Sequence, residues 1–327
     1  MTNRKDSKVR CECVTCAVCG SDRSGVVASG FDYEYWTVDQ KFTFVNCLDC
    51  GHLYLNPRPI RSEADSIYPK NYYTLSGRHT SRSSKTISFF KNIIIKKRLS
   101  FFNQILDSNA SVLEVGSGDC SLLISLKKTY PRLNLSGIDL AYSDIVKSQC
   151  SEIGIALIEG AIEDLRLPES AYDLVIMNQL IEHLWDPQGV VSKIGLSLKP
   201  AGFISIETPE ACGYDRQFFF NSFWGGYYFP RHMNLFSFDS IKRLLEKNGF
   251  SVTGHYSLVA PIVWAFSFKA FFCRTRNSKH RGGVLDRFFS DANSFCLAFF
   301  SFLDICAIFF GLTTSNQKII ARKNEKT

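Results

Sequence analysis

Short apolar runs recur through the middle of the chain, separated by segments with a helical spacing of apolar residues. The runs are nearly continuous in valine, leucine and isoleucine, which indicates strands buried on both faces of a parallel sheet. The last helical segment is well marked, because Ser237 is a typical N-cap, Ile241 and Leu244 share a face, and Gly249 can end the helix. We therefore expect an α/β sheet with strands at residues 111–116, 133–140, 155–159, 172–178, 202–208 and 251–257.

The first of these strands runs into a glycine turn. Residues 112–120 read VLEVGSGDC, and Asp139 ends the next strand. In a βαβ unit, glycines let backbone N–H groups approach a ligand, and an acidic residue at the tip of the second strand accepts hydrogen bonds from ribose hydroxyls. These features predict an adenosine-containing cofactor. A dinucleotide fingerprint would need a glycine where Ser121 stands, and the carboxylate of Glu114 suits a ligand with a cationic end better than a pyrophosphate.

The ordered motifs of this region resemble those of class I S-adenosylmethionine-dependent methyltransferases. They are Glu114-x-Gly116-x-Gly118, then GIDL at 137–140 and YDLVIMNQLIEHLWDP at 172–187. The resemblance implies a Rossmann-like, seven-stranded sheet with helices on both faces, in which residues 317–323 form a last strand inserted antiparallel beside the sixth. One departure is Cys120, which stands where the family often has a third glycine.

The resemblance also implies where S-adenosylmethionine binds. Asp139 is expected to hold the ribose diol, and Glu114 to face the methionine end or the glycine loop. Family members often place an aspartate against the adenine amine, but Ala161 occupies that position, so the adenine contact is expected at Ile162 or Glu163. The expected cofactor-binding residues are Glu114, Gly116, Ser117, Gly118, Asp139, Leu140, Ile162 and Glu163, with Asn178 and Gln179 beside the methyl group.

Two histidines are candidates for catalysis. Methyl transfer from a sulfonium is an in-line displacement, so holding the acceptor in place can supply most of the rate, and a base is needed only if the nucleophile must lose a proton. His183 follows strand four, where donor and acceptor should meet. His232 begins an H-x-x-x-F-S segment that resembles one in zinc-containing deoxysugar C-methyltransferases, where the histidine belongs to the active site. The alternative for each histidine is a loop cap.

Four cysteines near the N-terminus are spaced like zinc ligands. Cys16-x-x-Cys19 and Cys47-x-x-Cys50, each followed by glycine, can close a tetrahedral structural Zn²⁺ site that has no open position for catalysis. The segments FDYEYWTV (31–38) and KFTFVNC (41–47) have the composition of ribbon strands. We therefore expect a zinc ribbon over residues 11–56. Cys13-x-x-Cys16 fits the same spacing and Cys11 could be a spare ligand, so the register is open.

Composition fits one catalytic domain with additions. The 327 residues exceed a usual domain, and a hydrophobic content of 45% is enough for a sizeable core. The net charge of +7 is compatible with a nucleic acid, an anionic membrane or a phosphorylated substrate, and it selects none of them. No secretory signal is expected, and cysteines spaced for metal favour a reducing cytoplasm.

Two segments outside the predicted core, residues 61–110 and 258–316, differ from it in composition. Residues 61–110 are expected to form a connector with lid helices, where Tyr72 and Tyr73 are candidates to fold over the cofactor, or else to pack between domains. Residues 258–316 hold two apolar runs with a basic stretch between them. The expected division is therefore a zinc ribbon at 1–60, the connector at 61–110, the methyltransferase core at 111–257 plus 317–327, and an apolar helical insertion at 258–316.

The apolar insertion is expected to lie at a membrane surface rather than to cross it. Each run is shorter than the ~20 residues of a bilayer span, and Lys269 and Asp304 would be costly at its centre. The chain must also return to the same sheet for its last strand. We expect peripheral contact with the inner membrane through an interfacial insertion. A helical cap on the core, or a dimer face, is the alternative.

Three functions from different classes follow. The leading one is methyl transfer to a small, glycosidic or lipid-linked acceptor in bacterial cell-surface polysaccharide or related metabolism, because a zinc ribbon joined to such a core resembles bacterial enzymes that act on nucleotide-activated sugars or surface glycans. The second is an RNA base methyltransferase with an N-terminal zinc site. A nucleic acid is not favoured, because NQLI replaces the Asn/Asp-Pro-Pro-aromatic motif of amino-group methylases. The third is a non-catalytic binding protein. The sequence leaves open the acceptor atom (oxygen, nitrogen or carbon) and the oligomeric state.

Overall fold

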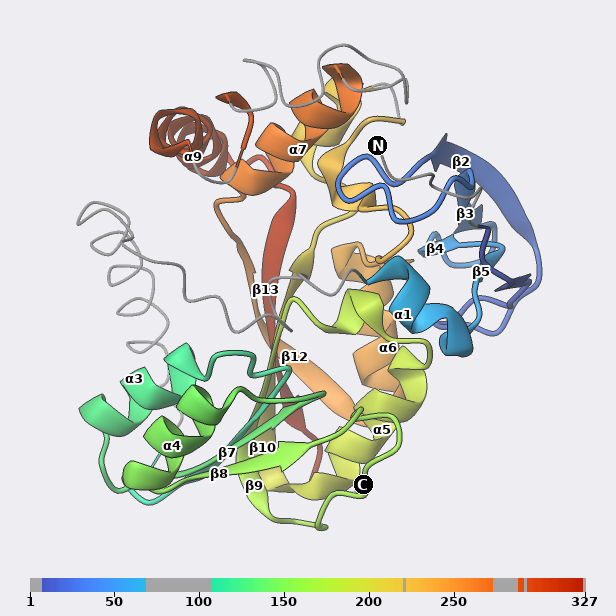
Figure 1. The fold of residues 1–327 in the computed structure, drawn as a ribbon. Coiled ribbons are helices and arrows are strands. Elements are labelled where there is room, and N and C mark those ends of the chain that lie inside the picture. The colour runs from blue at the N-terminus through green and yellow to red at the C-terminus, as the bar shows by residue number, and fades with distance from the viewer. Residues whose placement is uncertain (1–7, 69–106, 220–221, 273–287, 291–292, 326–327) are drawn as a thin grey trace.

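A mixed seven-stranded sheet forms the centre of the molecule (Figure 1). The structure, a computed structural model, describes residues 8–68, 107–219, 222–272, 288–290 and 293–325. The strand order is β12-β13-β10-β9-β6-β7-β8, with β13 antiparallel to both of its neighbours and the other pairs parallel. The expected fold is confirmed. The strands are β6 Ser111–Val115, β7 Asn134–Asp139, β8 Ile155–Glu159, β9 Tyr172–Asn178, β10 Leu198–Pro209, β12 Phe250–Ser257 and β13 Asn316–Lys323.

The central strands are buried on both faces, which explains their continuous apolar runs. Helices α3 and α4 cover one face of the sheet, and α5 and α6 cover the other (Figure 1). The edge strand β12 mostly alternates between more and less exposed positions instead. Ser237 caps α6 as predicted, accepting a hydrogen bond from Ser240 N at 3.2 Å, and Gly249 follows the helix with φ of +79°. The helices are α3 Ser121–Thr129, α4 Asp144–Glu152, α5 Pro187–Ser197 and α6 Phe238–Lys247.

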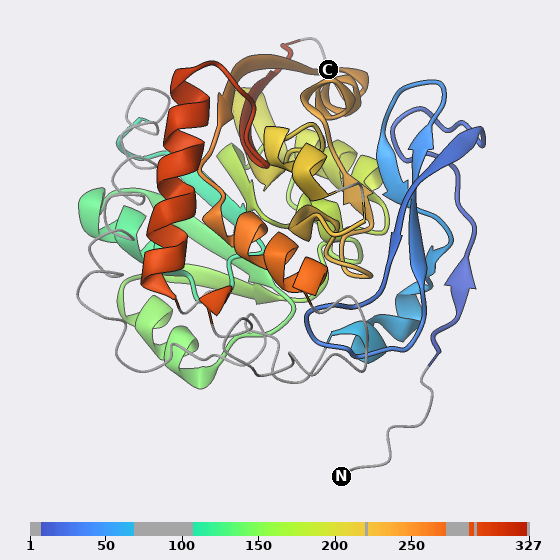
Figure 2. The same cartoon turned by 90° about the horizontal axis from the view of Figure 1, so that it is seen from above.

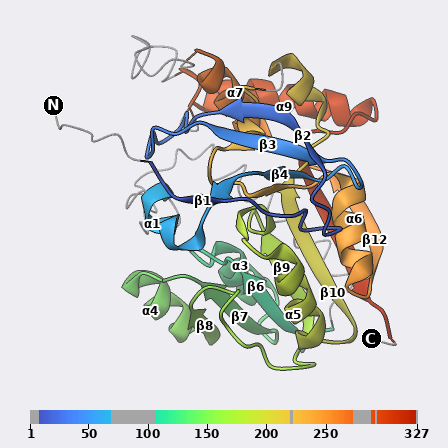
Figure 3. The same ribbon diagram turned by 90° about the vertical axis from the view of Figure 1, so that its right-hand side faces the viewer.

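A second, four-stranded sheet contains the N-terminal ribbon, which faces the viewer in Figure 3. Its order is β11-β4-β3-β2, and β11, Asn234–Leu235, comes from the loop that follows His232. The ribbon therefore shares its sheet with the catalytic half of the chain, and the division at residue 60 stays a prediction. The other ribbon strands are β2 Ser24–Gly30, β3 Phe42–Cys47 and β4 Leu53–Leu55, with a separate pair of β1 Cys11–Glu12 and β5 Arg58–Pro59.

The strand expected at residues 31–38 is wrong. This segment is a loop, because the Asp32 carboxylate accepts hydrogen bonds from Tyr35 N at 2.9 Å and Thr37 N at 2.8 Å, and Trp36 has φ of +53°. A side chain that binds nearby backbone N–H groups competes with a strand ladder. The strand lies just before this loop, in β2.

Short helices lead from the ribbon toward the connector. They are η1 Arg61–Glu63 and α1 Ala64–Ile67. The Arg58 guanidinium donates to Trp185 O at 2.6 Å, and the Trp185 indole donates to Pro59 O at 3.0 Å. These reciprocal bonds join the end of the ribbon to the segment after β9. The candidate lid residues Tyr72 and Tyr73 lie outside the described residues.

The apolar insertion contains helices α7 Pro261–Phe272 and α9 Ser294–Phe309. Figure 2 shows α9 and the ribbon on opposite sides of the molecule, with α7 between them. The rings of Trp264 and Phe300 stack with centroids 5.4 Å apart and join the two helices. Asp304 is buried at this contact and accepts hydrogen bonds from Ala260 N and the Trp264 indole, which offset the cost of its burial. Within the described ranges, the helices are too short or too polar to cross a bilayer.

Candidate active site

The glycine turn lies where β6, β7 and α3 meet. Gly116 has φ of +77°, and a side chain there would meet Leu180 at 3.2 Å. Gly118 N donates to Asp139 Oδ2 at 2.7 Å, and Leu140 N donates to Asp139 Oδ1 at 2.7 Å. Burial raises the pKa of Asp139, and these two backbone N–H groups act against that rise. The carboxylate that the sequence assigns to a ribose diol is thus held at the turn, beside the exposed side chain of Leu140.

Position 120 shows why a third glycine is common in this turn. Cys120 has φ of +56° at the start of α3, a left-handed conformation that favours glycine. Its side chain is fully buried, so a small residue is needed as well. Ser117, the next predicted cofactor residue, shares a 2.6 Å hydrogen bond with the Tyr142 hydroxyl behind the turn.

Two predicted residues come together at the end of strand four. Asn178 Nδ2 donates to Glu114 Oε1 at 3.3 Å, and Glu114 is buried. Gln179 adopts φ of +52°, donates its N–H to Glu207 O at 2.7 Å, and binds Asn316 through its side chain at 3.0 Å. Asn178 therefore lies against the acid of the glycine motif, whereas Gln179 links β9 to β10 and to the start of β13.

The two residues expected at the adenine contact both have partners in the chain that follows β9, Glu163 on the loop and Ile162 on α5. Glu163 Oε1 accepts hydrogen bonds from Trp185 N at 2.8 Å and Asp186 N at 3.1 Å. Lys193 Nζ donates to Ile162 O at 2.7 Å. These bonds fix the loop that carries His183, and the adenine contact stays a prediction for both residues.

The two histidines predicted to be catalytic are neighbours. Their ring centroids lie 4.8 Å apart at an interplanar angle of 69°. His183 belongs to η2, Ile181–His183, directly after β9, and His232 lies just before β11. Burial lowers the pKa of His183 to about 4 and holds the pKa of His232 well below its usual value, so both rings are neutral near pH 7.

A buried ion pair supports the histidine loop. Arg231 and Asp32 are both fully buried, and the guanidinium contacts the carboxylate at 3.0 and 2.8 Å. The Arg231 carbonyl accepts a hydrogen bond from His183 Nδ1 at 3.0 Å. The ribbon loop, the His232 segment and His183 are thereby connected in one network. Neither Asp32 nor Arg231 could be singled out from the sequence, because the ion pair joins positions far apart in the chain.

Glu182 is a further residue that sequence reasoning missed. It is fully buried beside His183, and burial raises the pKa of its carboxyl to about 8. Thr208 Oγ1 donates to Glu182 Oε2 at 2.9 Å, and Met233 N donates to the Glu182 carbonyl at 2.8 Å. Its place in the EHLWDP segment was the available signal. Glu182 thus connects the segment after β9 to the segment that carries His232.

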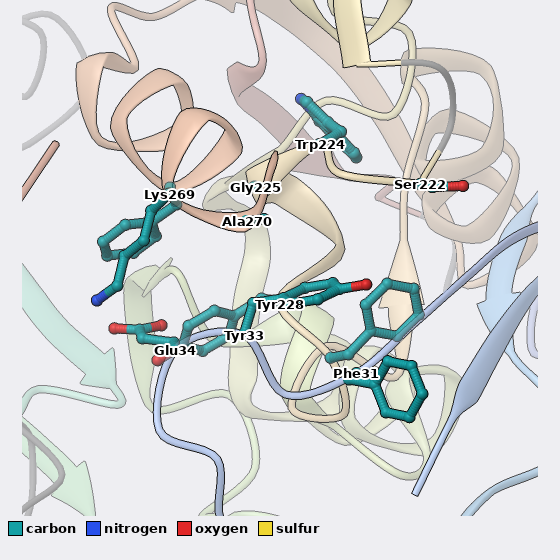
Figure 4. A pocket seen from close by; sticks show the side chains of 11 residues that line it. Phe31, Tyr33, Glu34, Ser222, Trp224, Gly225, Tyr228, Lys269 and Ala270 are labelled. Atoms are coloured by element: carbon teal, nitrogen blue, oxygen red, sulfur yellow. The ribbon is translucent and has the colours of Figure 1, made fainter. Parts of the chain in front are cut away.

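An aromatic pocket opens beside the histidines, between the ribbon loop, α7 and the turn η4, Gly225–Tyr227 (Figure 4). Tyr228 lines it, and the Tyr228 ring lies 6.3 Å from that of His183 and 5.0 Å from that of His232. Figure 4 shows the Glu34 carboxyl and the Lys269 ammonium at the same end of the pocket. Burial raises the pKa of Glu34 to about 7, while the charges of Arg231 and Lys269 act to lower it.

The four predicted zinc ligands converge. One sulfur from each of Cys16, Cys19, Cys47 and Cys50 lies within 4.8 Å of the others, with Cys16–Cys50 and Cys19–Cys47 at 3.5 Å. Zn–S bonds of about 2.3 Å in a tetrahedron place sulfurs about 3.8 Å apart, so this cluster has the size and donors of a structural zinc site. The glycines after Cys19 and Cys50 have φ of +82° and +74°, which lets each knuckle turn. Cys11 and Cys13 are not in the cluster.

Comparison with known proteins gives one family match. The family described as "Methyltransferase domain" matches residues 90–255, which is half of the chain. This range includes the glycine turn, Asp139 and both histidines, together with Glu182.

Named relatives match a little over a third of the chain. A malonyl-[acyl-carrier protein] O-methyltransferase of Priestia megaterium is 30% identical over 37% of this chain and 43% of its own length. A ubiquinone biosynthesis O-methyltransferase of Rickettsia bellii is 31% identical over 36% of this chain and 48% of its own. The chain thus spans less than half the length of these two relatives. The crystal structure of coclaurine N-methyltransferase has a TM-score of 0.48 at 15% identity, covering 79% of this chain and 77% of the other.

Proposed function

The chain belongs to this methyltransferase-domain family, and we propose that it transfers a methyl group from S-adenosylmethionine to a small, glycosidic or lipid-linked acceptor, in bacterial cell-surface polysaccharide or related metabolism. The observation that carries the proposal is the position of the aromatic pocket. Tyr228 lines this pocket and touches the ring of His183, and His183 follows the strand that ends at Asn178. Asn178 in turn binds Glu114 of the glycine motif. The proposed donor site and acceptor pocket are therefore linked through the end of β9 and the short segment that leads from it to His183.

The donor end of the proposal rests on the glycine turn. S-adenosylmethionine supplies an activated methyl group, and the residues of this chain orient it. Asp139 has its carboxylate fixed by two backbone N–H groups, as a ribose-binding acid requires. Glu114 lies buried at the end of β6, where a carboxylate can face the cationic end of the ligand.

The acceptor end rests on the chemistry of the pocket lining. Aromatic rings of Tyr33, Tyr228 and Phe266 provide flat apolar surfaces, and Glu34 and Lys269 provide polar groups at one end. A sugar ring has an apolar face and hydroxyls at its rim, so such a pocket suits a glycosyl group. Neutral imidazoles at His183 and His232 are suited to receive the proton that a hydroxyl loses when its oxygen takes the methyl group.

Oxygen is the acceptor atom that we favour. Two of the named relatives are O-methyltransferases, one of malonyl-[acyl-carrier protein] and one of ubiquinone biosynthesis. Both names also describe acceptors other than nucleic acid. The region that the family model matches includes the EHLWDP segment with His183, so the residues nearest the proposed acceptor oxygen belong to the methyltransferase domain.

We also propose that helix α9 touches the cytoplasmic face of the inner membrane. Its outward face carries large exposed side chains, with Phe295 74%, Phe299 53% and Phe302 62% exposed, followed by Ile305, Phe309 and Phe310. The opposite face packs on α7 through Phe300. A helix that is apolar on both sides can bury one face in the protein and the other at the boundary between lipid headgroups and acyl chains.

Incubation with S-adenosylmethionine labelled on the methyl group tests the proposed activity. The purified full chain is mixed with fractionated extract, and label is counted in lipid, glycan, small-molecule and RNA fractions. We expect label in glycan or lipid-linked material. Glu34→Gln should keep cofactor binding and reduce the transfer, because it alters only the acceptor pocket. Asp139→Ala should lose both.

Other results would contradict the proposal. Label in RNA would favour a base methyltransferase. Cofactor binding without label in any fraction would favour a binding protein of the same fold, and no cofactor binding at all would exclude the methyltransferase. A Glu34→Gln variant as active as the wild type would indicate that the acceptor binds at another surface.

A further inference from the structure

We propose that Glu182, His183 and His232 form a second metal site, which binds a divalent transition-metal ion. One carboxylate oxygen of Glu182 and one ring nitrogen of each histidine lie within 4.8 Å of one another. Two imidazoles and one carboxylate form a common ligand set for manganese, iron, cobalt and zinc. The site is separate from the four cysteines, whose thiolates favour softer metal ions.

The hydrogen bonds of the histidines leave the same nitrogen free on both rings. His183 Nδ1 lies 3.0 Å from the Arg231 carbonyl oxygen and 3.1 Å from the Tyr68 hydroxyl, which can accept as well as donate. His232 Nδ1 lies 2.8 Å from the Gly226 carbonyl oxygen. A carbonyl oxygen only accepts, so each Nδ1 must carry the proton. The lone pair of each neutral ring is then on Nε2, which has no hydrogen-bond partner among the residues that the structure describes. Metal-binding histidines typically donate their second ring N–H to a backbone carbonyl in this way.

Glu182 contributes an observation that points to a cation independently of the histidines. Its side chain is fully buried, and Oε1 has no hydrogen-bond partner in the described part of the chain. A buried polar atom left unsatisfied costs roughly 1–3 kcal/mol. The other oxygen, Oε2, accepts a hydrogen bond from Thr208 at 2.9 Å, which orients the carboxyl group. A cation bound to Oε1 would satisfy the remaining oxygen.

The three ligands lie on fixed elements rather than on loose loops. Glu182 and His183 belong to η2 directly after β9, and the Glu182 carbonyl accepts a hydrogen bond from Met233 N at 2.8 Å. His232 lies between Met233 and Arg231, whose guanidinium is held by the buried Asp32. The residues on both sides of His232 are therefore fixed, Met233 by the Glu182 carbonyl and Arg231 by Asp32. Such support is what a preformed site needs.

A cation here would change how the acceptor is activated. A divalent ion lowers the pKa of a bound oxygen ligand, so it can take over the role of a free histidine base. This consequence rests on the proposed function, since it needs an acceptor oxygen in the pocket. The binding of the ion does not.

Manganese binding to the zinc-loaded full chain tests the site. After dialysis against a chelator that leaves thiolate-bound zinc in place, Mn²⁺ is added, and the free ion is followed by electron paramagnetic resonance. We expect about one bound Mn²⁺ per chain, with spin-echo modulation from coordinated imidazole nitrogen. Affinity should fall by at least about tenfold in His183→Gln, His232→Gln and Glu182→Gln. His255→Gln, a change of the same type on β12, should bind Mn²⁺ like the wild type.

Two results would overturn the site. One is bound Mn²⁺ whose echo lacks imidazole modulation, a measurement on the wild type that does not depend on any variant folding. The other is an affinity that is undetectable in the wild type or equal in the folded histidine variants. Methyl transfer is measured separately. Intact Mn²⁺ binding without label transfer would contradict the proposed function and leave the metal site standing.

Discussion

Asp32 and Arg231, 199 positions apart, form a bidentate ion pair in which neither side chain is exposed to solvent. The guanidinium also lies over the ring of Tyr35 at 4.5 Å, so two ribbon residues contact it. Because the Arg231 carbonyl accepts from His183 and His232 is the next residue, this ion pair attaches the ribbon to the proposed active site. The ribbon thus holds the segment that carries the two candidate catalytic histidines in position.

Asp32→Asn should strongly destabilise the protein. The change leaves the Arg231 guanidinium buried without a counter-charge, and removing one partner of a buried pair typically costs about 3–5 kcal/mol. Urea unfolding followed by circular dichroism measures the change in the free energy of unfolding. Glu63→Gln is the control, because the Arg10 partner of Glu63 is 74% exposed and such surface pairs contribute little. Equal effects of the two substitutions would contradict the role given to the buried pair.

The same ion pair should make the free energy of unfolding depend on pH in the acidic range. Burial opposes ionisation of Asp32, but the hydrogen bonds and charge of Arg231 prevail and hold the pKa of this carboxyl below its usual value. The unfolded chain therefore binds the proton more readily, and the stabilisation is complete above about pH 4 and is lost as pH falls through the folded pKa. The stability difference between wild type and Asp32→Asn should shrink below about pH 4. A constant difference from neutral pH to about pH 3 would contradict this linkage.

Asp139→Ala should weaken S-adenosylmethionine binding by at least about tenfold. The substitution removes the carboxylate predicted to hold the ribose and the acceptor of the Gly118 N–H, and a hydrogen bond to a charged group contributes roughly 1.5–3 kcal/mol. Isothermal titration calorimetry measures the dissociation constant. Asp144→Ala, at the start of α4, should leave it unchanged. An unchanged affinity of Asp139→Ala for S-adenosylmethionine would show that Asp139 does not bind the ribose.

Cys47→Ser should lower the zinc content by about one ion per chain, because four thiolates are needed to close the site. Elemental analysis of the purified full chain gives the zinc-to-protein ratio. Cys13→Ser is the matched control, since Cys13 is exposed and does not belong to the sulfur cluster. Loss of zinc in Cys13→Ser would show that the alternative register, with Cys13 and Cys16 as the first pair of ligands, is the one used.

Phe302→Ser combined with Phe309→Ser should reduce the proportion of protein that floats with anionic lipid vesicles. Both side chains lie on the outward face of α9 and are 62% and 83% exposed, so the protein loses lipid contact without losing core packing. Burying a phenylalanine side chain is worth about 1.5–3 kcal/mol, so the two changes should weaken partitioning by at least about tenfold. Leu196→Ser, an exposed site on α5, serves as control. Equal flotation of the double variant and the wild type would rule out α9 as the contact.

The central sheet could be predicted from the sequence because its signals are local. Buried strands need continuous apolar runs, and Ser237 and Gly249 each mark one end of α6 through its own local backbone conformation. The glycine turn is equally local, since Gly116, Gly118 and Asp139 lie within one βαβ unit. Residues 31–38 misled the same reasoning, because aromatic content favours a strand whereas one Asp32 carboxylate holds the backbone in a loop.

The sequence by itself determined the α/β sheet, the glycine turn, the four clustered cysteines and both histidines as single candidates. Only the tertiary structure decided that His183 and His232 are neighbours, that Glu182 lies buried beside them, and that the ribbon supplies Asp32 to Arg231 and Glu34 to the aromatic pocket. The physical reason is range. Periodicity and capping act over a few residues, whereas these contacts join segments brought together only when the ribbon's sheet pairs with β11 and packs on the core.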